Sequence, residues 1–169
     1  MFPDDFISGL ISKHRENGVL IDSNLLLLLL VGTFDRNLIE RIKRLNKYSV
    51  RDFDLLQRFC ALFERILTTP HVLTEVSNLT QNSDDRRLLE FFRFFAERCG
   101  LLIERYQISA EIVRHSLFLS FGLADSALAM ESDQGMLLLT DDFPLCAALQ
   151  KRGCDAINFN HLRVANLSR

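Results

Sequence analysis

The six residues VLIDSN at positions 19–24 decide the fold, because they place a short buried strand directly before a helix. The first three are apolar and predict the strand. The aspartate, serine and asparagine that follow have side chains of the kind that cap the N-terminus of a helix. The next seven residues, LLLLLLV at 25–31, are too few to span a bilayer and predict a core helix. We expect this helix to end at Gly32.

The same alternation of short strands and helices continues along the chain. It predicts a parallel sheet with helices on both faces, which is an α/β fold of α/β/α layers. A helical extension over residues 1–18 precedes the domain that we expect over residues 19–169. In that extension, Phe6, Ile7, Leu10 and Ile11 fall on one side of a short amphipathic helix. Beyond the first strand, we expect strands over 66–68, 136–139 and 156–158, and helices over 36–45, 53–66, 70–79, 83–99, 109–119, 123–131 and 142–153.

Composition limits the classes of protein that this chain can represent. Its 169 residues suffice for one domain, and an apolar fraction of 48% excludes a disordered chain. The formal net charge of −2 provides no overall basic field for nucleic acid. Four widely spaced cysteines, without a C-x-x-C pair, are typical of reduced thiols in a cytoplasmic protein. The start MFPDD lacks the basic residues of a signal peptide, so we expect a cytoplasmic protein with no membrane partner.

Acidic side chains occur at four points where an apolar run ends or a helix begins. Asp22 and the pair Asp141 and Asp142 each follow a predicted strand directly. They therefore share the carboxyl edge of the sheet, where such folds bind ligands. Clustered carboxylates hold hard divalent cations. The four motifs are VLIDSN at 19–24, PHVLTE at 70–75, GLADS at 122–126 and LLTDD at 138–142.

The order and spelling of these motifs resemble the PIN-domain family of metal-dependent ribonucleases, from about residue 19 to about residue 158. The resemblance implies that Glu75 and Asp125 join Asp22 around Mg²⁺ or Mn²⁺, with Asn24 and Thr140 as polar supports. The family pattern places the fourth acid two residues after a threonine, which selects Asp142. If Asp142 instead caps the helix that follows it, Asp141 is the free carboxylate.

The implied activity is hydrolysis of RNA phosphodiester bonds by a divalent-metal-dependent endoribonuclease. Because the chain is slightly acidic, attraction of RNA must come from local cations. The best candidates for phosphate contacts are Arg41, Lys43, Arg44 and Lys47, although a plain solvated helix face explains them equally well.

Several interpretations of the function stay open at this point. Many small PIN-domain proteins are toxins of toxin–antitoxin pairs, which would make an antitoxin or another protein inhibitor a partner. This chain is longer than the minimal family member, so a housekeeping or defence-associated nuclease also fits. A non-catalytic PIN-like interaction module is the alternative class, and a homodimer stays open. Phosphoryl transfer through an aspartyl intermediate is disfavoured, because residue 24 is asparagine where that chemistry requires a second aspartate.

Overall fold

The sheet is parallel throughout and lies at the centre of the molecule. The computed structural model describes residues 5–79 and 86–167, and within them five strands follow the order β3-β2-β1-β4-β5. Leu20 in the central strand pairs with Leu67 on one side and Leu138 on the other. The strands are β1 (Val19–Ile21), β2 (Ile66–Thr68), β3 (Ile103–Glu104), β4 (Leu137–Thr140) and β5 (Ala156–Asn158).

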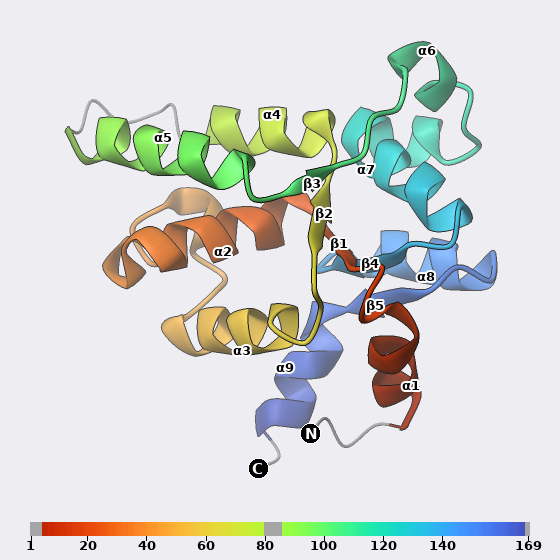
Figure 1. Ribbon diagram of the computed structural model, residues 1–169, viewed down its shortest axis with the longest axis horizontal. Helices are drawn as coiled ribbons and strands as arrows, with labels where there is room; N and C mark the ends of the chain where they lie inside the picture. The colour runs from red at the N-terminus through yellow and green to blue at the C-terminus, as the bar shows by residue number, and fades with distance from the viewer. Residues whose placement is uncertain (1–4, 80–85, 168–169) are drawn as a thin grey trace.

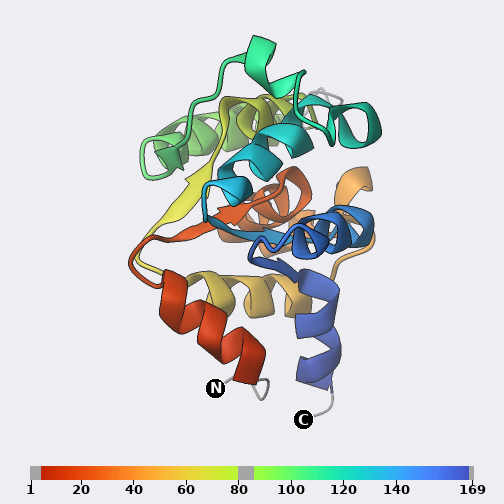
Figure 2. The same cartoon turned by 90° about the vertical axis from the view of Figure 1, so that its right-hand side faces the viewer.

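Helices cover both faces of this sheet, which confirms the predicted α/β class. Figure 1 shows the strands between α2 and α3 on one side and α7 and α8 on the other. Figure 2 shows α1 and α9 together at one end, with α4, α5 and α6 at the opposite end. The helices are α1 (Asp5–His14), α2 (Ser23–Phe34), α3 (Val50–Cys60), α4 (Pro70–Leu79), α5 (Arg86–Cys99), α6 (Ser109–Ile112), α7 (Phe118–Asp133), α8 (Phe143–Lys151) and α9 (Phe159–Leu167).

Helix α2 is apolar on every side because it is enclosed on every side. Its residues from Leu25 to Leu28 have no exposed surface, and α3, α4 and α5 all pack against it. The expectation that Gly32 ends the helix is wrong, because α2 continues to Phe34. A β-carbon at position 32 would lie 2.2 Å from the ring of Phe53. Gly32 therefore provides space for an aromatic ring of α3 and does not act as a stop signal.

Two predicted helices form differently from the expectation. The segment 36–45 is not one helix but two single 3-10 turns, η1 (Arg36–Leu38) and η2 (Lys43–Leu45). The predicted helix over 109–119 is divided into α6 and the start of α7. The predicted break at Gly122 is confirmed, since its positive φ of 79° bends α7 there. The spacing of apolar residues in both segments was compatible with one continuous helix, but so few apolar residues could not exclude turns.

Other differences concern the bounds of one helix and two elements that the apolar spacing did not indicate. Helix α3 is shorter than predicted and begins at Val50, where Ser49 and Asp52 form a reciprocal capping box. Strand β3 and helix α9 were not predicted. The expected helix start at residues 83–85 lies outside the described residues.

The N-terminal helix α1 contributes to the same core as the sheet. Ile7 and Leu10 are buried, whereas Phe6, expected on the same side, is exposed. Nε2 of the buried His14 lies 2.5 Å from the carboxylate of Asp155, which directly precedes β5. Within the part of the chain that the structure describes, no helix is long and apolar enough to cross a membrane.

Candidate functional site

Asp22 is held at the carboxyl end of the central strand by three donors. It follows β1 and caps α2, where its Oδ1 accepts a hydrogen bond of 2.8 Å from the Leu25 amide. Its Oδ2 accepts hydrogen bonds from the Thr140 hydroxyl at 2.5 Å and from the Asp141 amide at 2.8 Å. The side chain is therefore fixed by the first turn of α2 and by the end of β4.

The surroundings of Asp22 disfavour its negative charge despite these donors. Burial and the nearby charge of Asp141 raise its pKa to about 7, against the lowering effect of the hydrogen bonds from Thr140, Leu25 and Asp141. The residue is only 4% exposed. Asp22 thus stands near the midpoint of its titration at neutral pH when only protein groups surround it.

Asp141 accepts hydrogen bonds from three side chains. Its Oδ2 accepts from both the Lys47 ammonium and the Tyr48 hydroxyl, and its Oδ1 accepts from the Asn24 amide at 3.0 Å. Burial acts to raise its pKa, but the hydrogen bonds from Lys47, Tyr48 and Asn24 outweigh burial and lower it. Conversely, burial and the charge of Asp141 raise the pKa of Tyr48 far above its ordinary value. Asp141 is therefore ionised, and protein donors occupy both of its carboxylate oxygens.

Asp142 caps a helix and also contacts Thr140, the residue that donates to Asp22. Its Oδ1 accepts from the Leu145 amide at 2.8 Å and so caps α8. Its own amide donates to the Thr140 hydroxyl at 3.0 Å. Because the same hydroxyl donates to Asp22, Thr140 connects the two acids directly. The capping role that we considered for Asp142 is present, yet Asp141 is not left as a free carboxylate.

Glu75 and Asp125 extend the acidic group from two further helices. Glu75 on α4 accepts a hydrogen bond of 2.6 Å from Ser23, the first residue of α2. On α7, Asp125 has its pKa raised to about 6, first by burial and then by the charges of Glu75, Asp142 and Asp141. The structure thus brings Asp125 within electrostatic range of three of the other predicted acids, although their roles remain predictions. We name these five side chains, Asp22, Glu75, Asp125, Asp141 and Asp142, the acidic cluster.

Two polar residues of this region were missed by sequence reasoning. Ser23 was interpreted only as part of a helix start, and Tyr48 lies in a segment that was expected to follow a basic helix. Ser23 bonds to Glu75 across 52 residues, and Tyr48 bonds to Asp141 across 93 residues. No local pattern could have shown either pairing.

The acidic cluster suits a hard cation by the chemistry of its donors. Its members supply carboxylate oxygens, which Mg²⁺ and Mn²⁺ prefer, and burial together with nearby carboxylates raises the pKa values of Asp22 and Asp125. In the described ranges 5–79 and 86–167, no three His, Cys, Asp or Glu side chains form a ready-made metal-binding group. Protein donors instead hold Asp22, Asp141, Asp142 and Glu75 individually.

The four predicted RNA-binding cations do not share one environment. Arg44 donates from Nε to the Asn24 oxygen at 2.8 Å, and its charge partly opposes the rise in the pKa of Asp125. Lys47 is bound to Asp141. Arg41 and Lys43 are exposed, and the charge of Arg41 contributes to lowering the pKa of Asp35. Two of the four thus contact the acidic cluster or its supports.

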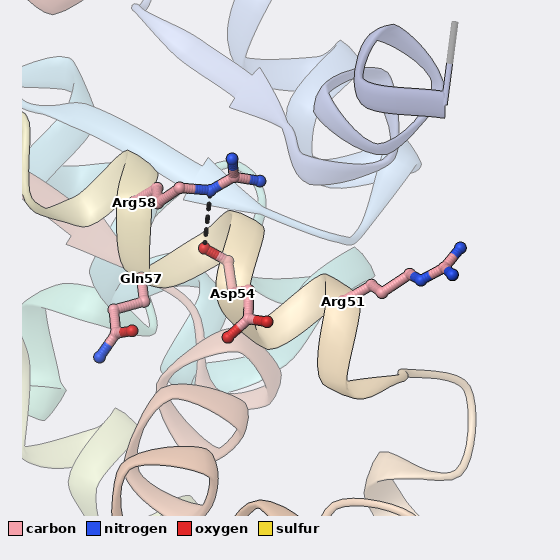
Figure 3. Close-up of a pocket in the computed structure, with 4 residues that line it drawn as sticks. All are labelled: Arg51, Asp54, Gln57 and Arg58. Atoms are coloured by element: carbon pink, nitrogen blue, oxygen red, sulfur yellow. Dashed lines mark hydrogen bonds between the residues drawn. The ribbon is translucent and has the colours of Figure 1, made fainter. Parts of the chain in front are cut away.

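Two hollows elsewhere on the molecule are not lined by any of the five acids. One, of about 470 Å³, lies against α3 and is lined by Arg51, Asp54, Gln57 and Arg58 (Figure 3). There Arg58 donates to the backbone oxygen of Asp54 at 3.2 Å. The other, of about 540 Å³, is mainly apolar and lies between α2, α3, α5 and strands β2 and β3.

Comparisons with known protein families, with curated proteins and with solved structures find no match to this chain.

Proposed function

We propose that this chain is a divalent-metal-dependent endoribonuclease that hydrolyses RNA phosphodiester bonds at the acidic cluster. The observation that carries the proposal is the placement of Asp22 and Asp142 at the carboxyl ends of two adjacent parallel strands, both in contact with Thr140. Asp125 lies close enough to Glu75, Asp142 and Asp141 for their charges, together with burial, to raise its pKa. A buried acid that its neighbours repel gains stability from a cation. The motif resemblance to PIN-domain ribonucleases supplies the reaction class.

In this proposal Asp22, Glu75, Asp125 and one of Asp141 and Asp142 hold Mg²⁺ or Mn²⁺. The chemistry that such an ion would supply, when bound, is activation of a water and stabilisation of the leaving oxygen of the phosphodiester. Thr140 supports this function by donating a hydrogen bond to Asp22, which keeps one carboxylate oxygen in a fixed orientation. Asn24 orients Asp141 in the same manner.

The basic residues and the thiols indicate how the proposed enzyme would bind RNA and where it would act. Arg41, Lys43, Arg44 and Lys47 are the candidates for contacts with the RNA backbone. All four cysteines are free thiols, which supports a reducing, cytoplasmic setting. A toxin-type or defence-associated role, with an antitoxin or another protein inhibitor, belongs to the same proposal.

The direct test is cleavage of a labelled single-stranded RNA with Mn²⁺ or Mg²⁺ and with EDTA. We expect cleavage that EDTA abolishes and that Asp22→Asn and Glu75→Gln each reduce by at least about 100-fold. Glu16→Gln is the matched control, because Glu16 is exposed and precedes β1 at the opposite edge of the sheet. Cleavage by Asp22→Asn at the parent rate, in a nuclease-free preparation, would refute the proposal.

The alternative function is a non-catalytic interaction module. One observation favours it: Asp141 is satisfied by Lys47, Tyr48 and Asn24, and Glu75 by Ser23, so part of the acidic cluster is stable with protein partners alone. A parent protein that binds neither Mn²⁺ nor Mg²⁺, and cleaves no RNA, would favour this alternative.

A further inference from the structure

Lys47 and Tyr48 contact the same oxygen of Asp141 but differ in how firmly they are held. Tyr48 is 3% exposed and its ring packs near that of Phe159 at a centroid distance of 6.4 Å, so its hydroxyl is a fixed part of the core. The Lys47 side chain is 49% exposed, whereas the Asp141 side chain that it contacts is 5% exposed. One donor is therefore built in, and the other reaches in from solvent.

We propose that Lys47 is a displaceable internal counter-ion, which neutralises Asp141 until a divalent cation binds the acidic cluster and then releases it. This inference rests on the proposed metal-dependent function. It adds a regulatory residue that neither the acidic motifs nor the comparisons assign.

The chemistry of a lysine suits this role. Its ammonium is a compact charge on a flexible four-carbon stem, so it can leave a carboxylate without any change in the backbone. Because half of the side chain is already in water, departure costs little desolvation or packing. A divalent ion would interact with several carboxylates of the acidic cluster, whereas the lysine neutralises only one of them. The ion is therefore the stronger partner once it is present, and the lysine is the partner when it is absent.

The structure also shows why Asp141 needs such a partner. The negative charge of Asp141 lies beside other groups of this region, since its amide donates to Oδ2 of Asp22 at 2.8 Å and its own Oδ2 accepts a hydrogen bond from Tyr48. A cation on Asp141 reduces the repulsion among the carboxylates of the acidic cluster. Removing the lysine should therefore leave a cluster that is more negative and that attracts a divalent ion more strongly.

The experiment measures Mn²⁺ affinity by calorimetry, without RNA, for the parent, Lys47→Met, Lys47→Arg and Lys43→Met. Lys47→Met keeps the apolar stem and removes the charge. We expect it to tighten Mn²⁺ binding by about tenfold. Lys47→Arg keeps the charge and should bind like the parent. Lys43→Met removes a charge from the same basic segment and should also change little. Lys47→Gln is the second uncharged variant, and circular dichroism verifies that each variant is folded.

Each outcome decides the inference. Unchanged or weaker Mn²⁺ binding by both Lys47→Met and Lys47→Gln overturns it, while the metal-dependent function stands as long as the parent binds Mn²⁺. Equal tightening by Lys43→Met also overturns it, because the effect is then one of general charge. If only the uncharged Lys47 variants bind Mn²⁺, Lys47 occupies the site permanently, which refutes release and the metal-dependent function together. Absence of binding by every protein likewise refutes both.

Discussion

The hydroxyl of Thr140 donates a hydrogen bond of 2.5 Å to Oδ2 of Asp22 and so joins the ends of two adjacent strands. This contact follows from register, since Ile21 on β1 pairs with Leu139 on β4. The residues after that pair are Asp22 and Thr140, which must therefore lie side by side. The position of the acid is thus as rigid as the sheet itself, and several consequences can be measured.

The stability of the metal-free protein should fall as the pH rises from about 4 to about 7. Asp22 has a pKa of about 7 in the folded state against about 3.8 in the unfolded chain, so the folded state binds more protons in this window. Stability therefore falls by up to about 1.4 kcal/mol per pH unit from this group and levels off above pH 7. Urea unfolding in EDTA at several pH values measures the slope. Asp22→Asn should reduce the slope, and an unchanged slope would show that Asp22 is already ionised throughout.

The two aspartates after β4 can be separated because serine also caps helices. Asp142→Ser keeps an oxygen for the Leu145 amide and removes the carboxylate, so stability should change by less than about 1 kcal/mol. If Asp142 is the fourth acid, RNA cleavage should fall by at least about 100-fold. Asp142→Ala is the control that removes both features and should also lose about 1 kcal/mol of stability. Full activity of Asp142→Ser, with loss of activity in Asp141→Asn, would assign the role to Asp141.

Replacing Gly32 with alanine should destabilise the fold although alanine is the better helix former. The new β-carbon would lie 2.2 Å from the ring of Phe53, and that ring is 1% exposed and cannot move freely. We expect a loss of about 1–3 kcal/mol in urea unfolding. Gly9→Ala is the matched control, because Gly9 lies within α1 with nothing within 4 Å of its added β-carbon. That variant should be neutral or more stable by up to about 1 kcal/mol.

The basic residues of segment 41–47 should contribute to RNA binding in a salt-dependent manner. In an inactive Asp22→Asn background, Arg41→Ala/Arg44→Ala should flatten the log–log salt dependence of RNA affinity by roughly one unit for each phosphate interaction that is removed. The weakening should be similar for all RNA sequences, because such interactions involve the backbone. Arg15→Ala/Lys151→Ala removes the same charge from exposed positions before β1 and at the end of α8. An equal slope for the two double variants would show that the predicted RNA-binding face is merely solvated.

The sequence by itself determined the parts of this protein that depend on neighbouring residues. Apolar runs such as residues 19–21 fix a strand because only burial satisfies them, and Asp22 and Asp142 stand where capping side chains begin helices. Parallel strands then place both acids at one edge of the sheet. Strand β3 escaped prediction because it has only two residues, and both are exposed.

The tertiary structure alone decided the partners of the acids that lie far away in the sequence. Lys47 reaches Asp141 across 94 residues, and Ser23 reaches Glu75 across 52, so no periodicity in the sequence carries either pairing. The same holds for Gly32, whose local signal as a helix stop was overridden by the packing of Phe53. The physical reason is shared: strand and cap formation are local free energies, whereas the neutralisation of a buried charge depends on whichever groups the completed fold places beside it.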